Sequence, residues 1–196
     1  MAFPQDRSRL TESVRVEDGY AAVQPIQWRC VTEVEDHYLA AHGDHQPGDV
    51  VRQVVYGNVL VNRGGTLLFK RLTTLKPSTS ATGAALQAYS SGTSRIGVGI
   101  STAAAAVTQT ALSGTAPAYQ GMSSGYPITS TAASTAARTG IFRALFSTAQ
   151  ANFPWNEWAL FNSTVAARSM LNRKVQSLGT KTSAATRQIT VTLSLA

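Results

Sequence analysis

The clearest pattern in the chain is a strict alternation of apolar and polar residues close to its C-terminal end. Over 187–195 the apolar residues alternate with Gln, Thr or Ser, which predicts a strand with one buried face. Another strand is predicted over 141–147, where Phe142, Ala144 and Phe146 fall on one face. Similar apolar or β-branched runs predict further strands over 50–61, 66–72, 95–100, 156–162 and 170–175.

The connections between these strands predict turns and long loops. Asn62-Arg63-Gly64-Gly65 is a turn signal, so we expect 50–61 and 66–72 to form a hairpin. The Ser/Thr/Gly/Pro-rich stretches 77–94 and 115–139 predict non-regular chain, and the Ala-rich stretch 102–114 lacks an apolar stripe, which favours an ordered loop. The glycines within 95–100 are expected to permit close approach of a neighbouring backbone.

The first 49 residues predict an extended, partly helical arm. Val31, Val34 and Tyr38 lie at three- and four-residue spacing, which indicates a weak helix within 28–41. The following run, 42–49, contains two glycines and a proline and breaks any regular element.

The number and type of these elements predict an all-β fold. Six or seven short strands without a long helix favour an antiparallel β-sandwich with long loops, since a parallel sheet would need crossover helices. We therefore expect two parts, an acidic N-terminal arm over 1–49 and a β-sandwich body over 50–196.

Composition adds an expectation about the surface. Only 14% of the residues are charged, whereas an ordinary soluble domain has about 25%. A weakly polar surface suits a subunit whose faces are covered by partners, although a solitary domain with a Thr-rich outer face has a similar composition.

The charges are divided unevenly along the chain. The first 50 residues hold nine acidic residues and four arginines, whereas the remaining residues hold thirteen Lys and Arg and one acid. Two interpretations stay open: the acidic arm of one subunit lies on the basic body of another, or the charges are simply solvated. The basic residues are spread singly along the body without an aromatic-studded basic motif, which argues against nucleic acid as a partner.

The sequence carries no recognisable catalytic pattern, and we predict no enzymatic activity, no metal and no cofactor. His37, His42 and His45 cluster near three aspartates, but their spacing matches no metal motif and favours a solvated loop. Beyond Asp49 the body has one carboxylate, Glu157, so a two-carboxylate hydrolase site cannot form there.

The remaining sequence signals concern thiols and membranes. The single cysteine, Cys30, excludes an intrachain disulfide and is expected to be buried and inert. No apolar run reaches the length of a membrane span, and the N-terminus lacks the pattern of a secretory signal. We therefore expect a product made in the cytoplasm with no membrane partner.

Glu157 is the residue singled out within the body, because it lies between Trp155 and Trp158. A lone carboxylate among aromatic residues is costly to bury unless it is paired, so we predict a structural ion pair with a partner such as Arg143 or Arg173. The alternative is a glycan platform formed by the faces of the two tryptophans.

Several motifs, taken in order, resemble a group of virion proteins from tailed bacteriophages. The similarity spans roughly 56–195, and no single motif is specific. The motifs are found at 95–102, 110–114, 125–127, 151–162, 170–174 and 190–192.

The resemblance implies a structural subunit of a tail, neck or head fibre, located in the virion. It also implies assembly as a homo-oligomer and docking to other virion structural proteins. A capsid decoration protein and a receptor- or glycan-binding tail module are the alternatives. The arm over 1–49 lies outside the similarity and is expected to make contacts between subunits or with a neighbouring structural protein.

Overall fold

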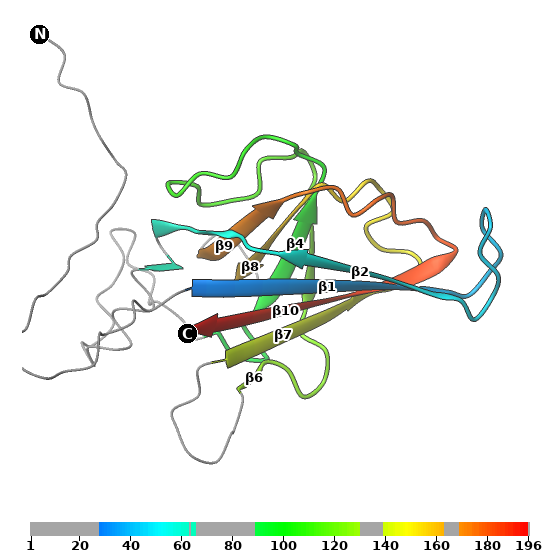
Figure 1. Ribbon diagram of the computed structural model, residues 1–196, viewed down its shortest axis with the longest axis horizontal. Coiled ribbons are helices and arrows are strands. Elements are labelled where there is room, and N and C mark those ends of the chain that lie inside the picture. Colours follow the sequence, from blue (N-terminus) through cyan, green and yellow to red (C-terminus); the bar gives the residue numbers. More distant parts are fainter. Residues whose placement is uncertain (1–27, 63, 66–88, 130–138, 163–168, 196) are drawn as a thin grey trace, which may run out of the picture.

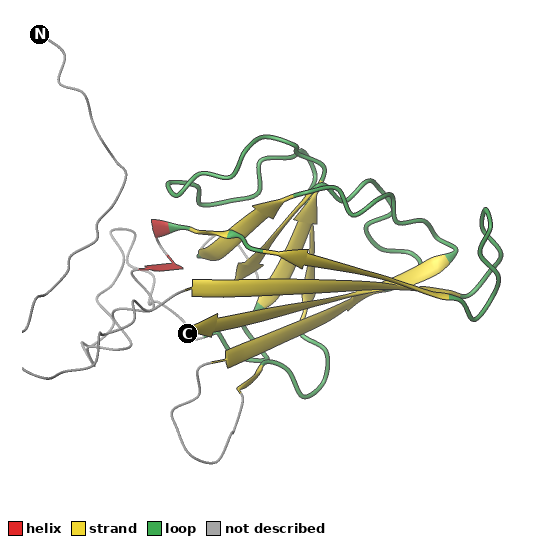
Figure 2. Ribbon diagram, in the orientation of Figure 1, coloured by secondary structure: helices red, strands yellow, loops and turns green. Residues whose placement is uncertain are grey.

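The computed structural model describes residues 28–62, 64–65, 89–129, 139–162 and 169–195, and it shows two antiparallel sheets of five strands each (Figure 1). Strands and loops make up the described chain except for a short helical turn that begins at residue 62 (Figure 2). The first sheet has the order β2(Val50–Tyr56), β1(Trp28–Tyr38), β10(Ala185–Leu195), β7(Thr139–Phe146), β6(Ile128–Thr129). The second has the order β3(Val59–Leu60), β9(Met170–Val175), β8(Glu157–Phe161), β4(Arg95–Gly99), β5(Ala118–Gly121). The predicted all-β antiparallel fold is confirmed, with more strands than the six or seven expected.

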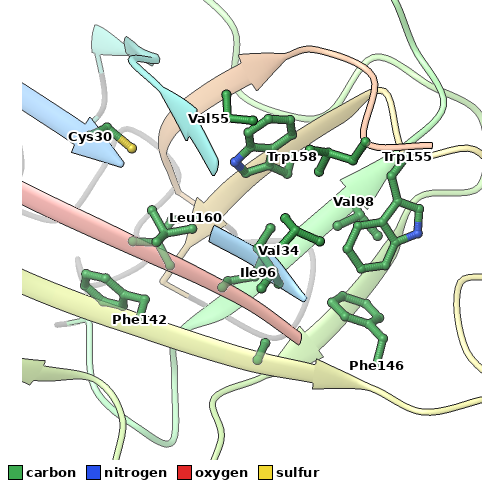
Figure 3. Close-up of a cluster of buried hydrophobic side chains, with 14 of the residues drawn as sticks. Cys30, Val34, Val55, Ile96, Val98, Phe142, Phe146, Trp155, Trp158 and Leu160 are labelled. Carbon is green, nitrogen blue, oxygen red and sulfur yellow. The ribbon is translucent and has the colours of Figure 1, made fainter. Parts of the chain in front are cut away.

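The main core lies between the two sheets. Alternate residues of β7 and β10 point inward, as their apolar pattern predicted, and meet residues from β4 and β8. The buried indole of Trp158 donates a hydrogen bond of 3.1 Å to Thr32 Oγ1, which connects the two sheets. Figure 3 shows Cys30, Val34, Val55, Ile96, Val98, Phe142, Phe146, Trp155, Trp158 and Leu160 in this cluster.

A second, smaller cluster covers the outer face of the second sheet. Every residue of β8 is buried, because Trp158 and Leu160 face the main core while Ala159 and Phe161 face the second cluster. Leu112, from the loop after β4, packs on this outer face. The second sheet is therefore covered on both faces by the chain itself.

The helix predicted within 28–41 is wrong, because this segment is β1, a strand inside the first sheet. Cys30, Thr32 and Val34 point into the core, so the true period is two. Thr32 is the source of the error, since it reads as polar but is buried and bonded to Trp158. Residues 28–49 thus belong to the two-sheet unit, while 1–27 lie outside the described residues.

The strand expected over 50–61 divides into two strands. Gly57 has a positive φ of 73°, and the chain turns there from β2 in the first sheet to β3 in the second. The other half of the expected hairpin, 66–72, lies outside the described residues. The stretch 115–139, expected to be non-regular, contains β5 and β6, two short edge strands with too few apolar residues to be seen in the pattern.

The prediction of a loop over 102–114 is confirmed, and the glycines of β4 are explained in a different way from that expected. A Cβ at Gly97 would lie 2.7 Å from the ring of Tyr119, so side chains rather than a neighbouring backbone occupy the space.

In the part of the chain covered by the structure, no helix has the length and apolar character needed to cross a membrane.

Candidate functional site

Glu157 and Arg173 form a fully buried ion pair on neighbouring strands of the second sheet. Both side chains have 0% exposure, and Arg173 Nε donates a hydrogen bond of 2.8 Å to Glu157 Oε2. Arg173 Nη2 lies 2.7 Å from the same oxygen, a charge contact without the angle of a hydrogen bond. The predicted ion pair is therefore confirmed, with Arg173 as the partner.

The ion pair holds the loop after β4 against the outer face of the sheet. The backbone N–H groups of Ser113 and Gly114 donate to the two carboxylate oxygens at 3.1 and 2.7 Å. Arg173 Nη1 donates to Ala104 O at 3.2 Å and to Gln109 Oε1 at 2.9 Å. Hydrogen bonds to a buried charge are among the stronger ones in proteins, so this network fixes the loop as one unit with the sheet.

Two glycines make room for the carboxylate. A Cβ at Gly99 would lie 2.6 Å from Glu157 Oε1, and a Cβ at Gly114 would lie 2.9 Å from the same atom. The ion pair and both glycines come from 95–102, 110–114, 151–162 and 170–174, four of the segments that carry the sequence resemblance. These segments thus meet around one buried carboxylate.

The geometry of this network is that of a structural centre. Both carboxylate oxygens of Glu157 are engaged by donors of the same chain, and the side chain has no exposed surface. A general acid or base must reach the substrate proton directly or through one water. Glu157 therefore stabilises the loop, and its carboxylate has no exposed surface at which a substrate could reach it.

The other residues predicted for the site, Trp155, Trp158 and Arg143, do not take part in the ion pair of Glu157 and Arg173. Trp155 and Trp158 are 0% and 2% exposed, so the predicted alternative of a glycan platform on their faces is wrong, because both indoles are used in the core. Arg143 lies on the first sheet, where its Nε donates to Thr190 Oγ1 and its guanidinium lies 4.6 Å from the ring centre of Tyr126.

A second ion pair, partly buried, was not predicted from the sequence. Arg187 of β10 binds Asp36 of β1 through two hydrogen bonds of 2.6 Å, and its guanidinium also lies over the ring of Trp155. The register of the two strands places Asp36 opposite Arg187. Only the assignment of 28–38 as a strand could have revealed this pair.

The three histidines lie at the end of β1 and in the loop that follows it. His42 and His45 pair with each other through backbone hydrogen bonds, and the ring of His45 stacks on Tyr38 at 4.3 Å. Among the residues that the structure describes, no three His, Cys, Asp or Glu side chains are grouped so as to hold a metal ion.

The first sheet has an open outer face, which is the strongest candidate for an interaction surface. The strand register places Tyr56, Val31, Thr192 and Ile141 side by side across four strands, and Ile128 continues this row. Tyr56 and Ile128, at the two ends of this row, are 72% and 43% exposed. The next rows are Val54, Glu33, Thr190 and Arg143, and then Arg52, Glu35, Gln188 and Leu145.

Most of the charges of this face are neutralised within the chain. Arg52 Nη2 lies 2.6 Å from Glu33 Oε2, and its Nε lies 3.6 Å from Glu35 Oε1. Gln188 Nε2 also donates to Glu35 at 3.0 Å. The face is therefore a mixture of apolar groups, threonines and paired charges.

Apolar exposure is greatest on the edge strand β2. Tyr56 is 72% exposed and Val50 is 55% exposed, while Val51 and Val54 are each 39% exposed. Contiguous exposed apolar groups of this kind often mark a site of protein interaction. The sequence predicted faces covered by partners but did not single out this strand, although the apolar run over 50–61 contained the signal.

Comparisons with protein-family models, with curated proteins and with solved structures found no match for this chain.

Proposed function

We propose that this chain is a structural β-sandwich subunit of a larger assembly, acting by self-association and by docking to neighbouring proteins. The observation that supports this most is the exposed apolar strand β2 beside the open face of the first sheet. The chain covers the outer face of its second sheet with its own loop, whereas Val50, Val54 and Tyr56 remain exposed on the outer face of the first. A face of that composition is satisfied best by other protein.

A structural role without catalysis agrees with the state of the polar residues. The carboxylate singled out in the body, Glu157, is fully enclosed and bonded. A hydrolase that used it would need the carboxylate in contact with substrate.

The state of the basic residues favours a protein partner over nucleic acid. Arg173 and Arg187 are buried in ion pairs, and Arg95 donates to the carbonyl groups of Gly92 and Ser94. Phosphate recognition needs exposed cations gathered on one face. These three arginines instead bind acceptors of the same chain.

The proposed assembly is the virion of a tailed bacteriophage, in a tail, neck or fibre position, with a capsid decoration protein as the alternative. This part of the proposal depends on the order of the sequence motifs, four of which meet around Glu157. Residues 1–27 keep the proposed role of a docking segment towards another virion protein.

A matched pair of substitutions tests the structural role. Val50→Lys places a charge on β2, and Val107→Lys makes the same change at a valine of similar exposure, 51%, in the loop on the second sheet. We expect Val50→Lys to reduce the molar mass measured by light scattering towards that of a monomer, because a lysine on an edge strand opposes pairing. Val107→Lys should leave the mass unchanged, and equal behaviour of the two variants would refute the proposal.

A further inference from the structure

The backbone of β2 is open along one side. Gly57 N–H donates to Cys30 O at 2.9 Å, and Tyr38 N–H donates to Asp49 O at 3.0 Å. These two bonds show that the odd-numbered residues on the β2 side direct their backbone groups towards β1. In an antiparallel ladder every second residue directs its N–H and C=O away from the neighbour. On β2 these are the residues that also direct their side chains to the outer face, namely Val50, Arg52, Val54 and Tyr56.

The residues of β2 themselves provide few of the usual protections of an edge against pairing. Native edge strands are commonly protected by proline, by a bulge, by inward-pointing charges or by lysine. Within β2 there is no proline and no register shift against β1. The one charged residue, Arg52, is paired with Glu33.

We propose that β2 pairs with β2 of a second copy of this chain, antiparallel and across a two-fold axis at Gln53. The two first sheets then form one continuous sheet. This inference depends on the proposed function, because it names the surface through which the subunits associate. An isologous contact of this kind is the commonest form of homodimer interface.

The register follows from the overlap of the strands and from charge. Only pairings that bring the open residues of one copy opposite the open residues of the other complete the ladder. With the axis at Gln53 the whole strand overlaps, Val50 lies opposite Tyr56 of the second copy, and Arg52 lies opposite Val54 of the second copy. Shifting the axis to Arg52 would place the two arginines directly opposite each other, which is unfavourable.

The side chains and the backbone of β2 are compatible with this pairing. The pair of Val50 and Tyr56 joins a β-branched and an aromatic residue, a favourable cross-strand combination. Tyr56 O already accepts a hydrogen bond of 2.8 Å from Lys174 Nζ, and a carbonyl has a second lone pair for the partner strand.

Cysteine cross-linking of the full chain tests the register. At the axis, the two copies of residue 53 form a non-hydrogen-bonded pair, whose Cα separation of about 4.5 Å permits a disulfide. In the Val50→Cys protein the two thiols would lie about 20 Å apart, at 3.3 Å for each of six residues. The native thiol, Cys30, is buried and does not compete.

We expect Gln53→Cys to form a disulfide-linked dimer under mild oxidation at a rate on the order of tenfold or more above Val50→Cys. An equimolar mixture of Val50→Cys and Tyr56→Cys proteins should cross-link, although neither does so alone. Thr129→Cys, on the exposed edge strand β6 at the other side of the same sheet, is the control for random collision. Unchanged thermal melting confirms that each variant is folded.

The result distinguishes this inference from the proposed function. Light scattering that shows an oligomer, combined with no preferential cross-linking at residue 53, overturns the β2 pairing and leaves self-association standing. A monomer in light scattering overturns both. Preferential cross-linking of Arg52→Cys instead of Gln53→Cys would overturn the register with its axis at Gln53.

Discussion

Glu157 is the residue whose substitution should destabilise the fold most clearly. Glu157→Gln leaves the guanidinium of Arg173 buried without an opposite charge, since both side chains have 0% exposure. We expect the free energy of unfolding to fall by about 3 to 5 kcal/mol, measured by urea denaturation.

The matched control for this substitution removes both charges. Glu157→Gln combined with Arg173→Met should be less destabilised than Glu157→Gln alone, because no uncompensated charge remains. A loss below about 1 kcal/mol for the single substitution, the size of an exposed pair, would contradict the account of this site.

Cys30 gives a prediction about pH. Burial raises the pKa of its thiol from 9.0 to about 11, with a hydrogen bond to Thr32 acting in the opposite direction. The protonated thiol is favoured in the folded chain, so its contribution to stability is complete below pH 9.0 and is lost as the pH rises towards 11.

The thiol should therefore be almost unreactive in the native protein near neutral pH. We expect Ellman's reagent to label Cys30 only after denaturation at pH 8, because the thiolate is the reactive form. Rapid labelling of the folded protein at that pH would show that the thiol is accessible and ionised.

The site residues could be predicted from the sequence only in part. Glu157 is conspicuous because it is the only acid after Asp49, and its need for a buried partner indicated an arginine. The sequence did not choose between Arg143 and Arg173, because the choice depends on which strands are neighbours. The pair of Asp36 and Arg187 has no local signal, since its members are far apart in the chain.

At the scale of elements, we expect deletion of β1 to prevent cooperative folding of the chain. β1 pairs along its length with both β10 and β2, and it contributes Cys30 and Val34 to the core. We therefore expect a chain lacking residues 1–49 to lose cooperative thermal unfolding, measured by circular dichroism. A chain lacking 1–27 keeps every described strand and should unfold cooperatively. Cooperative melting of the chain that lacks residues 1–49 would contradict the assigned role of β1.

The strands that the sequence predicted well have a clear apolar face. β10 alternates strictly, β7 places Phe142, Ala144 and Phe146 on one face, and β4 and β8 are short, largely apolar runs. β1 was missed because a buried threonine takes the place of an apolar residue, and β5 and β6 because edge strands have little to bury. The division between β2 and β3 depends on one glycine, whose conformation the sequence does not reveal.

At the scale of the whole molecule, the two sheets differ in how they are covered. The outer face of the second sheet carries the loop held by Glu157 and Arg173, whereas the first presents the exposed strand β2 and a row of apolar and threonine side chains. The acidic residues of β1 are paired within the chain, Glu33 and Glu35 with Arg52 and Asp36 with Arg187. These pairings argue against their binding to the basic body of another subunit, and we propose the open side of β2 as the contact between subunits.

Sedimentation velocity of the full, unmodified chain over a range of concentrations tests this account most directly. We predict a sedimentation coefficient that rises with concentration as copies associate through the first sheet. A single species with the 20.7 kDa mass of the monomer at every concentration would contradict the central claim.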